Sequence, residues 1–101
     1  MRRVVFAATA DQQLVKRRGW WRKHRDKAPN LFDEELAATC LDLAGQADAF
    51  PVHSGRRSRI IRRCLLPKTR THLFFVVDEQ KDEVTILAVW GAVRKSGPPL
   101  R

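Results

Sequence analysis

The chain has 101 residues, of which 44% are hydrophobic, so one packed domain is expected and wholesale disorder is excluded. Lysine and arginine number 20 against 11 acidic residues, and the resulting formal net charge of +9 favours nucleic acid, an anionic surface or an acidic protein as partner. No apolar stretch approaches the roughly 20 residues of a membrane span, and the N-terminal apolar run is too short for a signal peptide, so we expect a cytoplasmic protein without membrane contact.

The first elements expected along the chain are a strand and a helix. Residues 4–8 form a short run of β-branched, aromatic and small apolar residues, which is typical of a strand. A helix is expected next, with Thr9 or Asp11 as its N-cap. Trp21 falls on its apolar side, so the adjacent Trp20 points elsewhere and can anchor a partner. We expect the basic residues of this helix to form its solvated side: Lys16, Arg17, Arg18, Arg22 and Lys23.

The clearest element is a second helix, which begins after Pro29. Four apolar residues share one stripe of this helix: Phe32, Leu36, Cys40 and Leu43. Acidic residues at 33–35 suit the positive end of the helix dipole, and Gly45 is expected to end the helix. The two helices therefore form a hairpin, and its apolar seam needs a sheet to cover it.

The second half of the chain predicts that sheet. Residues 59–66, 72–78 and 84–90 read as three strands joined by two polar turns, which makes an antiparallel meander. The expected order is β-α-α-β-β-β, an α+β fold in which an N-terminal strand and a helical hairpin pack on a small, mainly antiparallel sheet. Residues 1–95 are expected to form this single domain, and residues 96–101 a short basic tail containing proline.

The segment GRRSRIIRRCLLPKTR, residues 55–70, contains many cations and no acidic residue, yet its middle is apolar. Alternate side chains of a strand point to opposite faces, so Arg59 and Arg63 share one face and Arg62 lies on the other. Neither face is purely apolar, and we expect the helices to shield only part of the sheet. The prediction is a concave basic surface lined by this strand and by a loop at 54–57.

No metal site or cofactor is expected. The histidines and cysteines are far apart and lack the paired short spacing of a zinc site. Both cysteines, Cys40 and Cys64, lie in apolar stretches and are expected to be free thiols, with a single disulfide as the alternative.

The order of elements and two long segments resemble the RelE/ParE superfamily of bacterial toxins. LPKTRTHLFFVVDEQKDEVTILAVWGAVR, residues 66–94, is similar to the second half of that family, with its leucine-proline turn, apolar strand, polar hairpin and final strand ending in tryptophan. FDEELAATCLDLAGQADAFPVHSGRR, residues 32–57, resembles its second helix and the loop before the basic strand. The resemblance covers residues 3–95.

The resemblance implies the toxin of a type II toxin–antitoxin system, closer to ParE, which arrests growth by binding a target such as DNA gyrase. It also implies neutralisation by a small acidic antitoxin whose disordered segment folds along the toxin. The expected antitoxin- or target-binding set is basic and aromatic: Arg56, Arg57, Arg59, Arg62, Arg63, Trp20, Arg94 and Lys95.

Two alternatives stay open. The first is a RelE-like endoribonuclease that cuts mRNA on the ribosome, for which the catalytic set would be His72, Arg59, Arg63 and Arg94. The chain has no tyrosine, and His72 stands where RelE-type nucleases typically carry an arginine. Cationic neighbours would disfavour protonation of His72 and make it a poor general acid. The second alternative is a basic nucleic-acid-binding domain.

Overall fold

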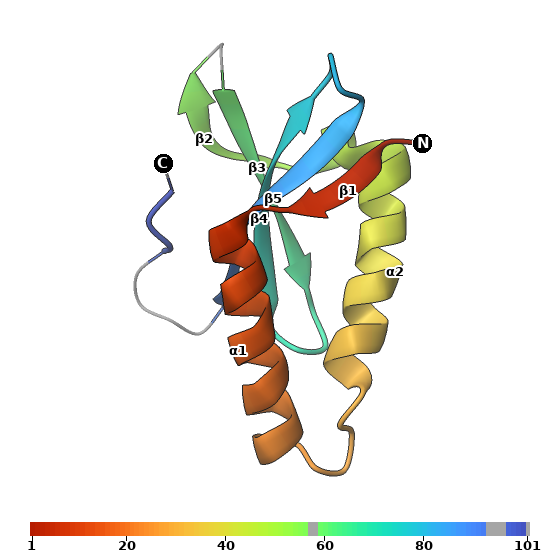
Figure 1. Cartoon of the computed structure of the whole chain (residues 1–101), viewed down its shortest axis with the longest axis vertical. Helices are drawn as coiled ribbons and strands as arrows, with labels where there is room; N and C mark the ends of the chain where they lie inside the picture. Colours follow the sequence, from red (N-terminus) through yellow and green to blue (C-terminus); the bar gives the residue numbers. More distant parts are fainter. Residues whose placement is uncertain (57–58, 93–96, 101) are drawn as a thin grey trace.

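The computed structural model describes residues 1–56, 59–92 and 97–100 (Figure 1). Its elements are, in chain order, β1 (Arg3–Phe6), α1 (Ala8–His24), α2 (Leu31–Gln46), a 3-10 turn η1 (Ala47–Ala49), β2 (Val52–Arg56), β3 (Arg59–Leu66), β4 (Thr71–Asp78) and β5 (Glu83–Gly91). This order confirms the predicted α+β class: a strand and two helices come first, and the rest of the sheet follows.

The strands form one sheet in the order β1-β5-β4-β3-β2. β1 runs parallel to β5 and the other neighbouring pairs are antiparallel, which confirms a mainly antiparallel sheet. β2 corrects the predicted loop at 54–57, because Ser54 and Gly55 pair with Ile61 and Ile60 of β3. Gly55 makes this hairpin possible: its φ is +127°, and a Cβ there would lie 2.0 Å from the carbonyl oxygen of Arg59.

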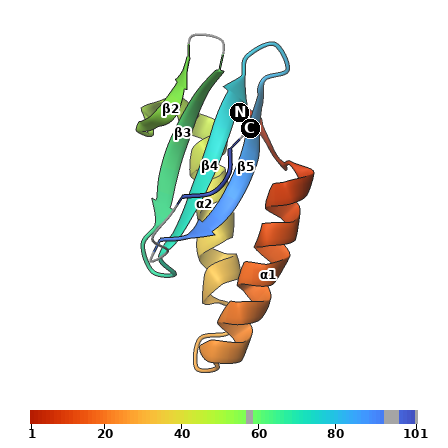
Figure 2. The ribbon, with the colours of Figure 1, turned by 90° about the vertical axis from the view of Figure 1, so that its left-hand side faces the viewer.

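Both helices pack on the same face of the sheet, as the two views show (Figures 1 and 2). The predicted stripe of α2 is confirmed, since Phe32, Leu36 and Leu43 are buried and Cys40 is half-buried. The main core continues through strand residues on that face of the sheet: Cys64, Leu66, Leu73, Phe75, Val84, Ile86 and Val89.

The predicted helix ends need small corrections. Ala7 is the N-cap of α1, and neither Thr9 nor Asp11 caps it, because the helix begins early enough to include both in its first turn. α2 runs one residue beyond Gly45 and passes into the 3-10 turn η1.

A bulge in β5 sends extra side chains to the face away from the helices. Phe74 is opposite Ala88 but Phe75 is opposite Ile86, so Leu87 is an additional residue on the β5 side. Ile61, Phe74 and Ala88 form a second buried cluster that includes no helical residue. We call the sheet surface around this cluster the helix-free face.

A polar network ties the helical hairpin to the β3–β4 turn. The Glu35 carboxylate of α2 accepts hydrogen bonds from the backbone N–H of Lys68 at 2.7 Å and from the N–H and hydroxyl of Thr69 at 3.0 and 2.7 Å. From α1, Arg17 donates to the Thr71 hydroxyl at 3.0 Å and to the Thr69 carbonyl at 2.6 Å. The turn is therefore held by one side chain from each helix.

The predicted solvated basic side of α1 is only partly correct. Lys16, Arg22 and Lys23 are exposed, but Arg17 and Arg18 are half-buried. Arg18 and Arg22 both pair with Asp33 of α2, at 2.7 and 3.0 Å. These cations join the two helices and are not simply solvated.

Candidate functional site

The candidate site is the helix-free face of the sheet. Ile61 of β3 belongs to the cluster on this face, so its alternate neighbours Arg59 and Arg63 lie there too. Cys64 and Leu66 of the same strand face the helices. The structure therefore confirms that β3 carries arginine on a face that the helices leave open.

Arg59 and Arg63 are exposed, and neither forms an ion pair with the described residues. Several acidic side chains of the chain are instead used elsewhere. Asp48 and Asp82 pair with Arg2, Glu83 pairs with Arg3, and Asp33 pairs with the α1 arginines. The two β3 arginines thus present positive charge that the described part of the chain does not neutralise, which suits an anionic partner.

Arg62 points to the other side of β3 from Arg59 and Arg63. By strand alternation it is on the same side of β3 as Cys64 and Leu66, which face the helices, and it is half-buried. Its Nη1 donates a hydrogen bond to the carbonyl oxygen of Phe50 at 2.8 Å. That bond fixes the chain after η1 against β3. Arg62 therefore has a structural contact that is not found for Arg59 or Arg63 among the described residues, although it lines the same cavity as Arg59.

His72 lies on the helix-free face beside the arginines. In the register it is opposite Leu65 of β3 and Trp90 of β5. The centre of its ring is 6.0 Å from the centre of the Phe74 ring, and the ring of His53 also contacts Phe74, at 4.8 Å. His72 therefore joins an aromatic row that continues the second cluster.

The environment of His72 favours the neutral imidazole. Burial lowers the pKa of His72 from 6.5, and the positive charges of Arg63, His53 and Arg70 lower it further. The predicted direction of the pKa change is thus correct, although burial is a larger cause than the neighbouring cations. Its Nδ1 atom is buried and has no hydrogen-bond partner among the described residues. The neutral imidazole can act as a general base, whereas the protonated form that a general acid requires is disfavoured.

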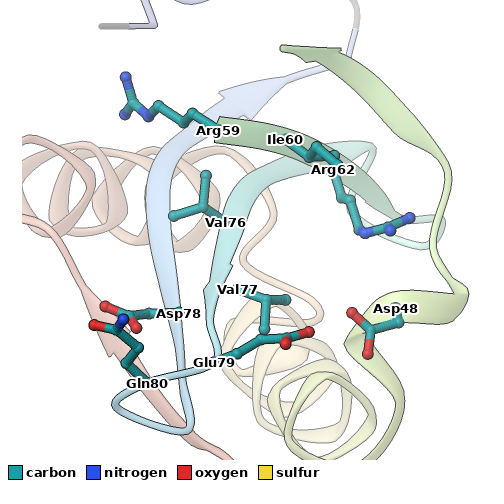
Figure 3. A pocket seen from close by; sticks show the side chains of 9 residues that line it. All are labelled: Asp48, Arg59, Ile60, Arg62, Val76, Val77, Asp78, Glu79 and Gln80. Carbon is teal, nitrogen blue, oxygen red and sulfur yellow. The ribbon is translucent and has the colours of Figure 1, made fainter. Parts of the chain in front are cut away.

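Near Arg59 the sheet splits. β3 and β4 are paired from Arg62–Phe75 to the turn, but no pairing joins residues 59–61 to residues 76–78. Figure 1 shows the β2–β3 hairpin diverging from β4 and β5. The divergence leaves a cavity of about 520 Å³, and Figure 3 shows the side chains that line it. Ile60, Val76 and Val77 give it apolar walls, with Arg59 at one side and Asp78 and Glu79 at the other. The sequence did not predict this cavity, because strand divergence depends on the twist of the hairpin.

Trp20 lies on α1, away from the β3 arginines in the fold. The residue is 39% exposed. Its ring stacks on His24 at 4.6 Å, and the guanidinium groups of Arg17 and Arg25 lie 5.0 and 5.4 Å from the ring centre. Trp20 also lines a cavity of about 590 Å³ between α1 and β5, together with Trp90. The structure does not bring Trp20 into the arginine cluster.

Trp21 has the buried position predicted for it. It is 7% exposed, and its Nε1 donates to the carbonyl oxygen of Ala28 at 2.8 Å. Both cysteines are free. Burial is the main cause that raises the pKa of Cys64 to about 12, so this thiol is unreactive at neutral pH.

Several predicted site residues cannot be placed. Arg57, Arg94 and Lys95 lie outside the described residues. Arg56 is opposite Arg59 in the β2–β3 register, and only its backbone is described. Of the predicted set, the structure brings Arg59, Arg63 and His72 to one face.

The described residues provide neither a cluster of metal ligands nor a membrane-spanning helix. No group of three or more His, Cys, Asp or Glu side chains there is placed to hold a metal ion. None of the described helices is long and apolar enough to cross a membrane.

Comparison with known proteins adds no assignment. No protein-family model matches the chain, and the search of curated proteins finds no similar sequence. Function must therefore be argued from the fold and from the helix-free face.

Proposed function

We propose that the chain is the toxin of a bacterial type II toxin–antitoxin system, ParE-like, and that it arrests growth by binding a target such as DNA gyrase. The observation that carries the proposal is the helix-free face, where Arg59 and Arg63 stand exposed beside an apolar cluster and have no acidic partner among the described residues. The order of elements supports it as well, since it agrees with the family resemblance of the sequence.

An acidic antitoxin is the partner that this surface suits. A disordered segment rich in acidic and apolar residues would place carboxylates near Arg59 and Arg63 and apolar side chains on the cluster of Ile61 and Phe74. The charge on the toxin would then act mainly on the association rate, because long-range attraction steers the encounter and salt screens it.

Action by binding suits the groups on this face better than catalysis. Cleavage of RNA through its 2′-hydroxyl needs a general base, a general acid and cations that hold the phosphate. The face offers cations and, in His72, a possible base. No tyrosine occurs in the chain, and the lowered pKa of His72 disfavours the protonated form that a general acid needs. The expected pair of proton-transfer groups is therefore incomplete.

One observation keeps the nuclease as a second candidate. The Nδ1 atom of His72 is buried without a hydrogen-bond partner among the described residues, and Arg63 is a neighbour on the same face. Purified protein added to translating ribosomes discriminates between the candidates. We expect intact mRNA at stoichiometric protein, and cleavage that disappears in His72→Ala would replace our proposal with the nuclease.

The proposal is tested by inducible expression in bacteria with and without the product of the adjacent reading frame. We expect growth arrest on expression alone and rescue when a small acidic partner is co-expressed. Normal growth at a protein level at which the chain is soluble and folded would refute the proposal. It would leave a plain nucleic-acid-binding domain, which gel-shift titration with duplex DNA and single-stranded RNA would identify.

A further inference from the structure

The described tail residues 97–100 lie on the helix-free face. Figure 2 shows the C-terminal segment crossing β4 and β5 on the side opposite the helices. Leu100 packs against the cluster of Ile61, Phe74 and Ala88 and is half-buried. One tail side chain therefore covers part of an apolar patch of the sheet.

Burial alternates along the described tail residues 97–100. Gly97 and Pro99 are exposed, whereas Pro98 and Leu100 are half-buried. An extended chain turns one side toward the surface beneath it in this way. Proline fixes φ, so a segment with two prolines loses less conformational entropy when it is immobilised. The patch therefore accepts an extended apolar segment.

The tail fits the apolar part of this surface but not its charge. The patch is bordered by Arg59, Arg63 and His53. By sequence the tail, residues 96–101, contains no acidic residue and ends in an arginine. A segment that combined an apolar residue in the position of Leu100 with neighbouring carboxylates would satisfy both parts of the surface.

We propose that the cluster of Ile61, Phe74 and Ala88 is a docking site for an extended, acidic segment of a partner protein, and that the tail is an exchangeable occupant of this site. A partner must displace Leu100 to bind. The partner's apparent association constant is therefore its intrinsic value multiplied by the fraction of time that the tail leaves the site open. That the partner is an antitoxin rests on the proposed function, whereas the competition by the tail does not.

The first experiment uses the full chain and needs no natural partner. The probe is a synthetic peptide of residues 95–101 in which Lys95 and Arg101 are replaced by glutamate, so that the apolar residues are kept and the charge is reversed. It is titrated into three chains: the natural chain, Leu100→Asp and Pro99→Asp. Pro99→Asp is the matched control, because it adds the same charge one residue away at an exposed position.

We expect the peptide to bind the Leu100→Asp chain about fivefold more tightly than the other two, which corresponds to a tail that covers the site for roughly four-fifths of the time. Amide resonances of Ile61, Phe74 and Ala88 should shift in that titration. The same peptide with Leu100→Asp should not bind. Circular dichroism and thermal unfolding establish that both variant chains are folded.

Equal affinity for all three chains would refute the competition by the tail. Absence of binding to any of them, or resonance shifts confined to the helices, would refute the docking site itself. A second measurement covers the case in which Leu100→Asp is unstable: the natural-sequence peptide, added in excess to the natural chain, should compete with the acidic peptide. None of these measurements involves toxicity. They can therefore refute the docking site without refuting the proposed function, and the growth assay can refute the proposed function without refuting the docking site.

Discussion

The interaction between Glu35 and the β3–β4 turn allows a quantitative prediction for stability. In Glu35→Ala, two backbone N–H groups and one hydroxyl lose a charged acceptor, and Thr69 is 1% exposed, so water cannot easily replace the carboxylate there. Hydrogen bonds to charged groups contribute about 1.5–3 kcal/mol each when buried and much less when exposed. The bond to Lys68 is exposed and the two to Thr69 are partly buried. We therefore expect the free energy of unfolding to fall by about 3 kcal/mol.

Urea unfolding followed by tryptophan fluorescence measures this loss, with Glu34→Ala as the control. Glu34 is the exposed neighbour in the same helix turn, and its side chain forms no hydrogen bond with the described residues. Its replacement should change stability by less than about 0.5 kcal/mol. Glu35→Gln keeps an acceptor oxygen and should give an intermediate loss. A loss below about 1 kcal/mol in Glu35→Ala would show that the turn holds its conformation without α2, and the reasoning would be wrong.

Three further predictions concern the hairpin, the histidine and the arginines. Gly55→Ala should destabilise the fold by about 2 kcal/mol, because its φ is +127° and the new Cβ meets the Arg59 carbonyl; a change near zero in urea unfolding would contradict the described β2–β3 hairpin. Folding lowers the pKa of His72, so as pH falls below 6.5 this histidine is protonated in the unfolded chain before it is protonated in the folded chain. The free energy of unfolding should therefore decrease as pH falls from 6.5 to the lower pKa of the folded state. His72→Gln should flatten that decrease, and an unchanged pH profile would count against the burial of His72. Joint reversal of Arg59 and Arg63 to glutamate should slow antitoxin association and weaken its salt dependence, and stopped-flow rates equal to those of the natural chain would refute the docking surface.

The sequence was sufficient for the first strand, the two helices and the last three strands, and for the core side of α2. The spacing of Phe32, Leu36 and Leu43 has the helical period, and burial against the sheet follows from it directly. The alternation along β3 likewise placed Arg59 and Arg63 together. Such local periodicity is decided by neighbouring residues, so a single sequence suffices to predict it.

The parts that were missed depend on contacts between distant segments. Ser54 and Gly55 are residues typical of a turn, and only pairing with β3 makes them a strand. The bulge at Leu87, the split between β3 and β4, and the tail contact through Leu100 all depend on how strands twist and meet. Likewise, Glu35 and Arg17 look like ordinary surface charges until the β3–β4 turn is folded against them.

The central claim is that the helix-free face arrests growth by binding, with no catalytic part for His72. It is tested most directly by the growth of bacteria that express four versions of the chain at matched levels: natural, Arg59→Glu with Arg63→Glu, Lys23→Glu with Lys27→Glu, and His72→Ala. The lysine pair is exposed on and just after α1 and changes the net charge by the same amount as the arginine pair. We predict arrest by the natural chain, the lysine variant and His72→Ala, and growth with the arginine variant. Growth with His72→Ala, or arrest by the arginine variant, would contradict this account.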